Sequence, residues 1–290
     1  MSLPLKWWMK IPAKMVLSRL PIDYSLFRSL SMFKHGYMID PDYAFNVARQ
    51  HYEFAKPWLD ENFTVLELGP GDSLLSALNM TALGAEKCYL VDVGKFATME
   101  TQVYQNALSY LEEKQGYTLE QVDRSAQSVD ELFQNINMEY LTDGLSSLQT
   151  IPDESVDFIW SHAVLEHVRL GDFDAIMKEL HRILKPGGVC SHVVDLKDHM
   201  EESLNNLRFS EKTWESDLFA KSGFYTNRLR HEEIIKSFKN AGFNIHSDKT
   251  YAWEKLPIAK SSLDESYQQY PEDDLLVYEF DVILTKADAS

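Results

Sequence analysis

The sequence predicts an α/β fold: a seven-stranded, mostly parallel sheet with an antiparallel end strand, helices on both faces and helical additions. The first observation is that short apolar runs alternate with amphipathic segments between residues 61 and 195. That alternation is typical of a parallel sheet built from strand–helix units. The second observation is a late segment in which apolar and polar residues alternate, as in a half-buried and often antiparallel strand.

Strands are expected where apolar residues run almost without interruption, because parallel strands are buried on both faces. Four clear runs and one weaker run lie at residues 64–68, 87–93, 156–161, 189–196 and, for the weaker one, within 138–151. Near the C-terminus, Tyr278, Phe280 and Val282 alternate with acidic residues. This alternation predicts a strand over residues 276–284 that pairs with residues 243–252.

Helices are expected over residues 73–83, 173–184 and 231–241, because each segment carries apolar residues at helical spacing. Asp72 is a candidate N-cap for the first helix, and Gly84 is expected to end it. These helices would cover the faces of the sheet between the predicted strands.

The composition excludes several classes of protein. No apolar run in the 290 residues approaches the roughly 20 residues that span a bilayer. Two cysteines cannot build a disulfide framework. The net charge of −17 argues against a nucleic acid partner, because phosphate binding needs a basic surface.

The first 34 residues differ from the rest of the chain. They hold six basic residues and one acidic residue, together with Trp7 and Trp8. Such a segment suits a lid over a pocket, packing on its own domain, or peripheral contact with an anionic membrane. The segment has no features of a secretory signal, so we expect a cytoplasmic protein, with membrane-peripheral placement as the alternative.

The strongest chemical motif is the stretch 67–72 (ELGPGD), where an apolar strand runs into a turn and then a helix. Gly69 and Gly71 allow a ligand to approach the backbone, and the helix start offers N–H groups. About twenty residues later Asp92 ends the next strand, where a carboxylate suits ribose hydroxyls. The pattern predicts nucleoside binding. Leu74 stands where a dinucleotide motif has its third glycine, which disfavours a nicotinamide oxidoreductase.

Four motifs together resemble the class I S-adenosylmethionine-dependent methyltransferases, whose fold is Rossmann-like. They follow the family order over residues 60–195, at positions 67–72, 91–92, 151–161 and 184–188. Ser73 stands where many members have a further glycine, and a small residue still fits there. The resemblance implies a transferase whose cofactor is S-adenosyl-L-methionine.

The resemblance also implies roles by position. The glycine turn would meet the methionine end of the cofactor, the acid that ends the second strand would hold the ribose, and Asp143 would lie near the adenine. The residues implied to bind the cofactor are Glu67, Gly69, Gly71, Asp92, Asp143, Gly144 and Ser161.

The motifs divide the chain into four parts. Residues 1–60 would form an N-terminal helical lid or extension, and residues 61–195 the S-adenosylmethionine-binding core. Residues 196–230 would form a substrate-selecting insertion, because members of this class commonly place one after the fifth strand. Residues 231–290 would supply a helix and a strand hairpin that complete the core.

Three histidines are candidate catalytic bases. A hydroxyl acceptor needs a group that takes its proton, and ligands gather at the carboxyl ends of the strands in such sheets. His162 directly follows the fourth strand and is the first candidate, His199 follows the fifth, and His167 lies between them in sequence. For each histidine the alternative is a structural or solvated side chain.

The segment 161–167 also resembles ubiquinone-pathway O-methyltransferases. Some of these are metal-dependent and use an acidic residue at the position of Ala163. Alanine leaves Glu166 and His167 an incomplete ligand set unless His162 or a distant residue completes it. We therefore assign no metal site from the sequence.

The predicted insertion supplies the candidate substrate residues Asn227, Arg228 and Arg230. Asparagine and arginine beside aromatic residues suit a sugar, phosphate or carboxylate, although the arginines can equally pair with acids of this chain. A fainter resemblance to bacterial methyltransferases of surface-polysaccharide and glycolipid synthesis favours a glycan-like acceptor.

We therefore expect O-methylation of a small-molecule or glycan-like acceptor. Two alternatives remain: methylation of nitrogen or carbon in a metabolite, and a methyltransferase-like subunit that binds a partner without catalysis. The sequence does not identify the acceptor or the oligomeric state.

Overall fold

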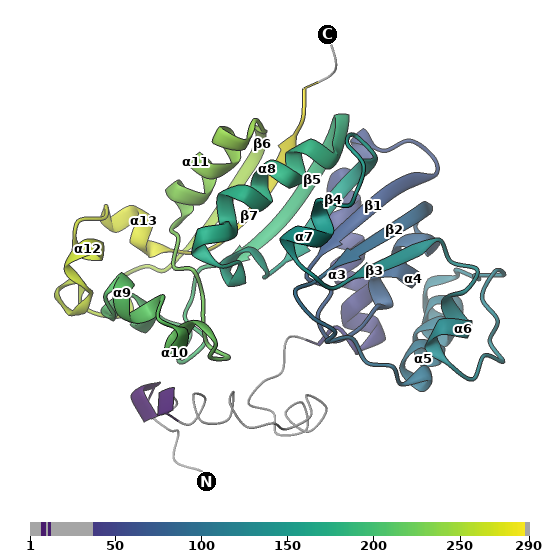
Figure 1. Ribbon diagram of the computed structural model, residues 1–290, viewed down its shortest axis with the longest axis horizontal. Helices are drawn as coiled ribbons and strands as arrows, with labels where there is room; N and C mark the ends of the chain where they lie inside the picture. The colour runs from purple at the N-terminus through teal and green to yellow at the C-terminus, as the bar shows by residue number, and fades with distance from the viewer. Residues whose placement is uncertain (1–6, 10, 13–36, 288–290) are drawn as a thin grey trace.

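The computed structural model describes residues 7–9, 11–12 and 37–287. A seven-stranded sheet forms its centre, with the strand order β3-β2-β1-β4-β5-β7-β6 (Figure 1). The strands are β1 (Phe63–Leu68), β2 (Ala85–Val91), β3 (Met138–Leu141), β4 (Val156–His162), β5 (Leu184–Asp195), β6 (Asn244–Ala252) and β7 (Val277–Thr285).

The sheet is parallel from β3 to β5, and β7 is antiparallel to both of its neighbours, β5 and β6. This confirms the predicted mostly parallel sheet, and the antiparallel strand lies one place in from the edge. The strand order reverses between β1 and β4. At such a reversal the loops on the two sides diverge, which opens a crevice at the carboxyl ends of the strands.

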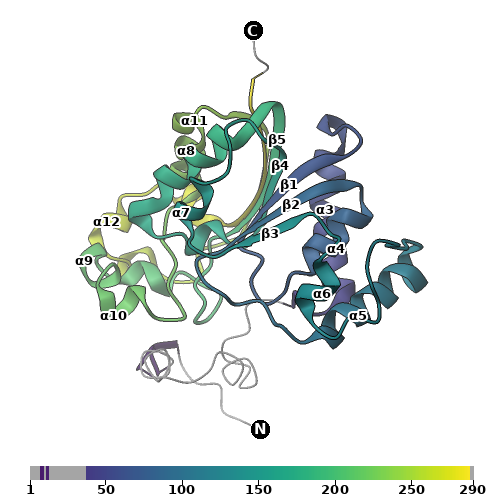
Figure 2. The ribbon, with the colours of Figure 1, turned by 45° about the vertical axis from the view of Figure 1, so that its right-hand side comes forward.

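Helices cover both faces of the sheet (Figure 2). Those on one face are α3 (Pro41–Ala55), α4 (Leu75–Ala82), α5 (Thr101–Tyr110) and α6 (Val129–Phe133). Those on the other face are α7 (Leu145–Leu148), α8 (Phe173–Ile183) and α11 (His231–Ala241). The remaining helices, α9 (Glu211–Trp214), α10 (Asp217–Ala220), α12 (Glu265–Gln268) and α13 (Glu272–Leu276), lie beyond one end of the sheet.

One local prediction was wrong. The helix predicted to be capped by Asp72 begins at Leu75, and its N-cap residue Leu74 makes no side-chain cap. Asp72 is instead buried in the turn before it. The weaker strand predicted within residues 138–151 is confirmed as β3, which is short because the chain then turns at Gly144, with a positive φ of 53°, and enters α7.

Helix α3 is integral to the domain, although the sequence analysis grouped it with the N-terminal extension. Asp40 caps its first turn by accepting a hydrogen bond from the backbone of Tyr43. Ala44, Phe45 and Ala48 are buried against the sheet side. Among the residues that the structure describes, no helix is both long and apolar enough to cross a membrane.

The insertion after β5 folds around aromatic side chains. Trp214, Phe219 and Phe224 form a small buried cluster, and Trp7 packs against its edge. The backbone N–H of Trp7 also donates to the Glu201 carboxylate at 2.9 Å. Part of the N-terminal segment therefore rests on the insertion of its own domain.

Arg230 ties the insertion to the end of the sheet. Its side chain is 1% exposed, and its guanidinium donates to the carbonyl oxygens of Leu196, Asp274, Leu275 and Val277. These carbonyls belong to the chain leaving β5 and to the segment entering β7. A single cation therefore satisfies buried backbone acceptors from two distant parts of the chain.

Replacing Arg230 with methionine should destabilise the protein by about 3 kcal/mol or more, because several buried carbonyls would lose their donor. Urea denaturation followed by circular dichroism measures the change. The control is Arg124→Met, which removes a surface guanidinium paired with Glu112 and should cost less than about 1 kcal/mol. Equal denaturation midpoints for the two variants would contradict this role for Arg230.

Candidate functional site

Backbone hydrogen bonds join the loops at the carboxyl ends of β1, β2 and β3. The N–H of Gly69 donates to Val91 O at 2.8 Å, and the N–H of Gly144 donates to Asp92 O at 2.9 Å. The N–H of Gly71 donates to the Asp92 carboxylate at 3.2 Å. Four of the residues implied to bind the cofactor are thus brought together, with Asp92 at their centre.

The two glycines after β1 have different surroundings. Both have positive φ, 75° at Gly69 and 65° at Gly71. A Cβ atom at Gly69 would lie 2.6 Å from the methyl groups of Val164, whereas a Cβ at Gly71 would meet no atom within 4 Å. Gly69 therefore permits two loops to pack, and Gly71 leaves open space beside the backbone. That open space fits a ligand such as S-adenosylmethionine, which must approach the chain closely.

Hydrogen bonds from neighbouring residues orient the Asp92 carboxylate but do not fill all of its acceptor positions. One carboxylate oxygen accepts from Gly71 N–H, and the other accepts from Val93 N–H at 2.7 Å. Burial raises the pKa of Asp92, and these two backbone donors oppose the rise. A carboxylate has about four acceptor positions, so Asp92 retains capacity for hydroxyl groups such as those of a ribose. Asp143 is exposed on the adjacent loop, and its N–H donates to Ser147 Oγ at 2.9 Å.

The side chains of Glu67 and Ser161 are buried in the interior, below the carboxyl ends of the strands. Glu67 is buried and accepts a short hydrogen bond from the Ser76 hydroxyl on α4. Burial raises the pKa of Glu67 to about 8, so the carboxyl group is largely protonated at neutral pH. Ser161 is fully buried, with Oγ 2.7 Å from Nδ1 of His192, whose pKa burial lowers to about 3. The side chains of Glu67 and Ser161 therefore support the strands that carry the edge.

His162 ends β4 and belongs to a buried polar chain that the sequence analysis missed. Its Nδ1 lies 3.2 Å from Nε2 of His51, and Nδ1 of His51 lies 2.8 Å from Ser191 Oγ. Burial lowers the pKa of His51 well below its usual value, with the charges of His162 and His192 adding to the effect. Burial also lowers the pKa of His162, so its imidazole is neutral near pH 7. The helical spacing of His51 with the buried Ala44, Ala48 and Ala55 is the signal that could have identified it.

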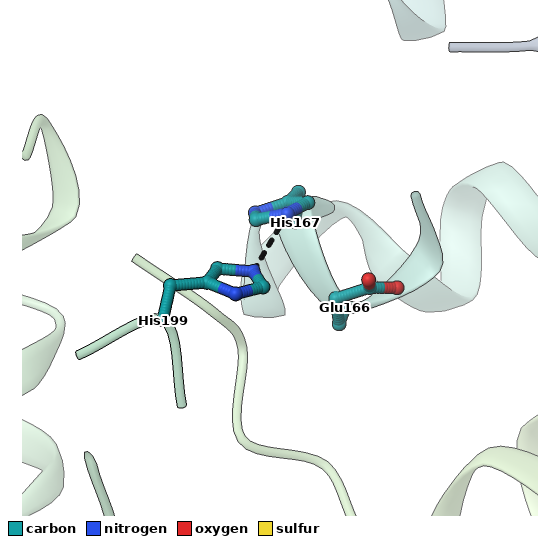
Figure 3. A group of neighbouring side chains, drawn as sticks. All are labelled: Glu166, His167 and His199. Atoms are coloured by element: carbon teal, nitrogen blue, oxygen red, sulfur yellow. Dashed lines mark hydrogen bonds between the residues drawn. The ribbon is translucent and has the colours of Figure 1, made fainter. Parts of the chain in front are cut away.

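His167 and His199 form a second histidine pair, on the loops after β4 and β5 (Figure 3). Their Nε2 atoms are 3.0 Å apart, and their rings are stacked with centroids 4.8 Å apart. Nδ1 of His167 contacts the carbonyl oxygen of Tyr225 at 2.9 Å. Since a carbonyl only accepts, that nitrogen carries the proton. All three candidate bases therefore lie where β4 and β5 end, in two separate groups.

The candidate substrate residues of the insertion point inward. Asn227 Nδ2 donates to Leu165 O at 2.8 Å, and Asn227 N–H donates to Glu166 O at 2.7 Å. The Arg228 guanidinium donates to Phe209 O at 2.6 Å and lies 5.2 Å from the ring of Trp214. Because Arg230 also binds carbonyl oxygens, the hydrogen bonds of all three side chains are made within the protein. The arginines pair with backbone oxygens rather than with the acids of the chain.

The end of the N-terminal segment, just before helix α3, lies against the glycine turn. The Ser73 hydroxyl, just after the turn, donates a short hydrogen bond to the carbonyl oxygen of Met38. Met38 also packs on the core beside α3. Residues 13–36, part of the N-terminal segment that the sequence analysis considered for a lid, lie outside the described residues, but Met38, which follows them, touches Ser73 directly after the 67–72 motif.

Comparison with known proteins identifies related methyltransferases. A family model described as a methyltransferase domain matches residues 42–248. A Methanosarcina mazei S-adenosylmethionine-dependent methyltransferase is 16% identical, with 82% of this chain and 99% of that one covered and a TM-score of 0.49. Phosphoethanolamine N-methyltransferase 2 of Haemonchus contortus is 14% identical, with 95% and 60% covered and a TM-score of 0.49.

The curated protein sequences contain no significant match to this chain. The family match spans most of the chain and includes every strand from β1 to β5 together with helix α3. The glycine turn, Asp92 and the open space at Gly71 fit the cofactor that the family uses. The chain therefore belongs to the methyltransferase-domain family and is an S-adenosylmethionine-dependent methyltransferase.

Proposed function

We propose that the protein transfers the methyl group of S-adenosylmethionine to an oxygen atom of a small-molecule or glycan-like acceptor. The observation that carries the proposal is that β4 ends at His162, while His167 and His199 pair on the loops after β4 and β5, with Val164 of the same stretch packed against Gly69. An oxygen nucleophile must lose a proton, and neutral imidazole is the side chain suited to take it near pH 7. The glycan-like class rests on the sequence resemblance alone.

The cofactor supplies an electrophilic methyl group on sulfur. In the proposed reaction the acceptor oxygen forms a bond to that methyl carbon while the carbon–sulfur bond breaks, and the oxygen's proton passes to an imidazole. Gly71 borders the methionine end of the cofactor, and Asp92 holds the ribose. His162 is the first candidate for the proton acceptor, because its buried ring is neutral and is fixed by His51. Alignment of the two reacting atoms supplies much of the rate enhancement in such displacements.

Asp92→Ala should weaken S-adenosylmethionine binding by about tenfold or more, because charge-assisted hydrogen bonds to hydroxyl groups are lost. Isothermal titration calorimetry measures the dissociation constant. Asp130→Ala, which removes an exposed carboxylate on α6, is the control and should bind as the wild type does. Unchanged affinity in Asp92→Ala would contradict the proposed role of Asp92.

Gly71→Ala should also weaken S-adenosylmethionine binding, because the new methyl group would enter the open space beside the turn. Gly116→Ala is a matched control, since Gly116 has a φ of 77° and equally open surroundings. Both substitutions carry a similar backbone strain of about 1 kcal/mol, so thermal denaturation should show similar losses of stability. Calorimetry should separate them, and equal affinities would show that Gly71 does not face the cofactor.

His162→Ala and His199→Ala should lower turnover while leaving S-adenosylmethionine affinity intact. The assay uses S-adenosylmethionine labelled in the methyl group with panels of phenol, carboxylate and sugar acceptors. Because burial lowers the pKa of His162, the wild-type rate should hold at pH 6.5 and fall only at lower pH, as the ring becomes protonated. Normal turnover in both variants would rule out these bases and favour methylation of nitrogen or carbon.

A further inference from the structure

Three side chains of the kinds that bind metal ions converge after β4 and β5. Glu166 and His167 lie on the short helical turn η3 (Leu165–His167), and His199 lies on the loop after β5. One ligand atom from each residue lies within 4.8 Å of the other two. Figure 3 shows the His199 imidazole facing that of His167, with Glu166 beside them. His199 is the distant residue that the sequence alone could not associate with the Glu166–His167 pair.

The two imidazoles are spaced as ligands of one ion. Metal–imidazole bonds are about 2.0–2.1 Å long, so two Nε2 atoms 3.0 Å apart would subtend about 90° at a shared metal. That is the angle between neighbouring ligands of an octahedral ion. His167 is already oriented, because its Nδ1–H is held by Tyr225 O and its Nε2 carries the lone pair when the ring is neutral. Metal-binding histidines typically donate their other ring N–H in this way.

Glu166 supplies an independent observation. Its side chain is 2% exposed, and neither carboxylate oxygen has a hydrogen-bond partner. A buried carboxyl group without a partner is costly, whether it is charged or neutral. A cation bound beside it would compensate that cost. The nearby histidines provide the other ligands that such a cation requires.

The ligand-bearing turn is rigidly held. Asn227 donates from its side chain to Leu165 O at 2.8 Å and Val168 O at 3.1 Å, and its backbone N–H donates to Glu166 O. Asn227 thus brackets η3 from both ends. Glu166 is buried, His199 is half-buried and His167 is exposed. The cluster therefore combines a fixed backbone and a buried carboxyl group with a histidine that an incoming ion can reach.

We propose that Glu166, His167 and His199 bind a divalent transition-metal ion, with coordination positions left open for an acceptor oxygen. Two imidazoles and one carboxylate suit ions such as Mn²⁺, Fe²⁺, Co²⁺ and Zn²⁺ rather than Ca²⁺. The metal site itself stands on these three residues. Its role in activating an acceptor hydroxyl as a Lewis acid rests on the proposed O-methyl transfer. In that role His167 and His199 are ligands, and His162 remains the proton acceptor.

The test is a titration of the metal-free protein, prepared with a chelator and then desalted, with Co²⁺. Binding is followed by visible absorbance and by calorimetry. The wild type should bind one Co²⁺ and develop the absorbance of an ion with nitrogen and oxygen ligands. His199→Ala and Glu166→Gln should each weaken binding at least tenfold. His246→Ala, which removes an exposed histidine on the edge strand β6, should bind as the wild type does.

Two further measurements make the result decisive. Circular dichroism verifies that the variants are folded, and His199→Ala is the reference variant because its side chain is only half-buried, whereas that of Glu166 is buried. No Co²⁺ binding by the wild type, or equal binding by His199→Ala, would overturn the metal site. Calorimetry with S-adenosylmethionine is run on the same preparations. Failure of that binding would count against the proposed function and leave the Co²⁺ result independent of it.

Discussion

The packing of Gly69 against Val164 is the contact on which the site depends. It joins the loops after β1 and β4 at the point where the strand order reverses, and a single added methyl group would collide with Val164. Gly69 leads directly to the turn whose N–H groups face Asp92. Val164 lies two residues after His162 and two before Glu166. One close approach of the backbone therefore fixes the position of the glycine turn relative to the loop that carries Glu166 and His167.

Much of the fold could be predicted because its local signals agree with its packing. The helix over residues 231–241 occurs with the predicted bounds, since Ile234, Ile235 and Phe238 form one buried face and Gly242 ends it in a left-handed conformation. The Asp72 cap failed for the opposite reason. Aspartate has a strong local preference for the N-cap position, but Asp72 is buried in a turn that long-range packing constrains. Tertiary structure therefore overrode the local preference.

The site could be predicted only in part. The proximity of Gly71 and Asp92 could be predicted, because a strand, a turn and a second strand place them together within 21 residues. The partnership of His167 with His199 spans 32 residues, and that of His51 with His162 spans 111. No pattern in the sequence specifies which two histidines meet across such separations. The sequence also does not specify the direction in which a side chain points. Ser161 and Arg230 were therefore expected to contact ligands, although both side chains are directed into the interior.

The inward arginines change which recognition chemistry suits the acceptor. On an acidic chain, Arg228 and Arg230 seemed to favour an anionic group, but their guanidinium groups hold backbone carbonyls that would lose their donors if either side chain turned outward. Lys197, near the end of β5, is engaged with Asp195 at 3.1 Å and Glu279 at 3.6 Å. A cation held by Glu166, His167 and His199 would supply positive charge that these side chains do not. In the proposed O-methyl transfer it would stabilise the developing alkoxide of the acceptor, which a net charge of −17 otherwise disfavours.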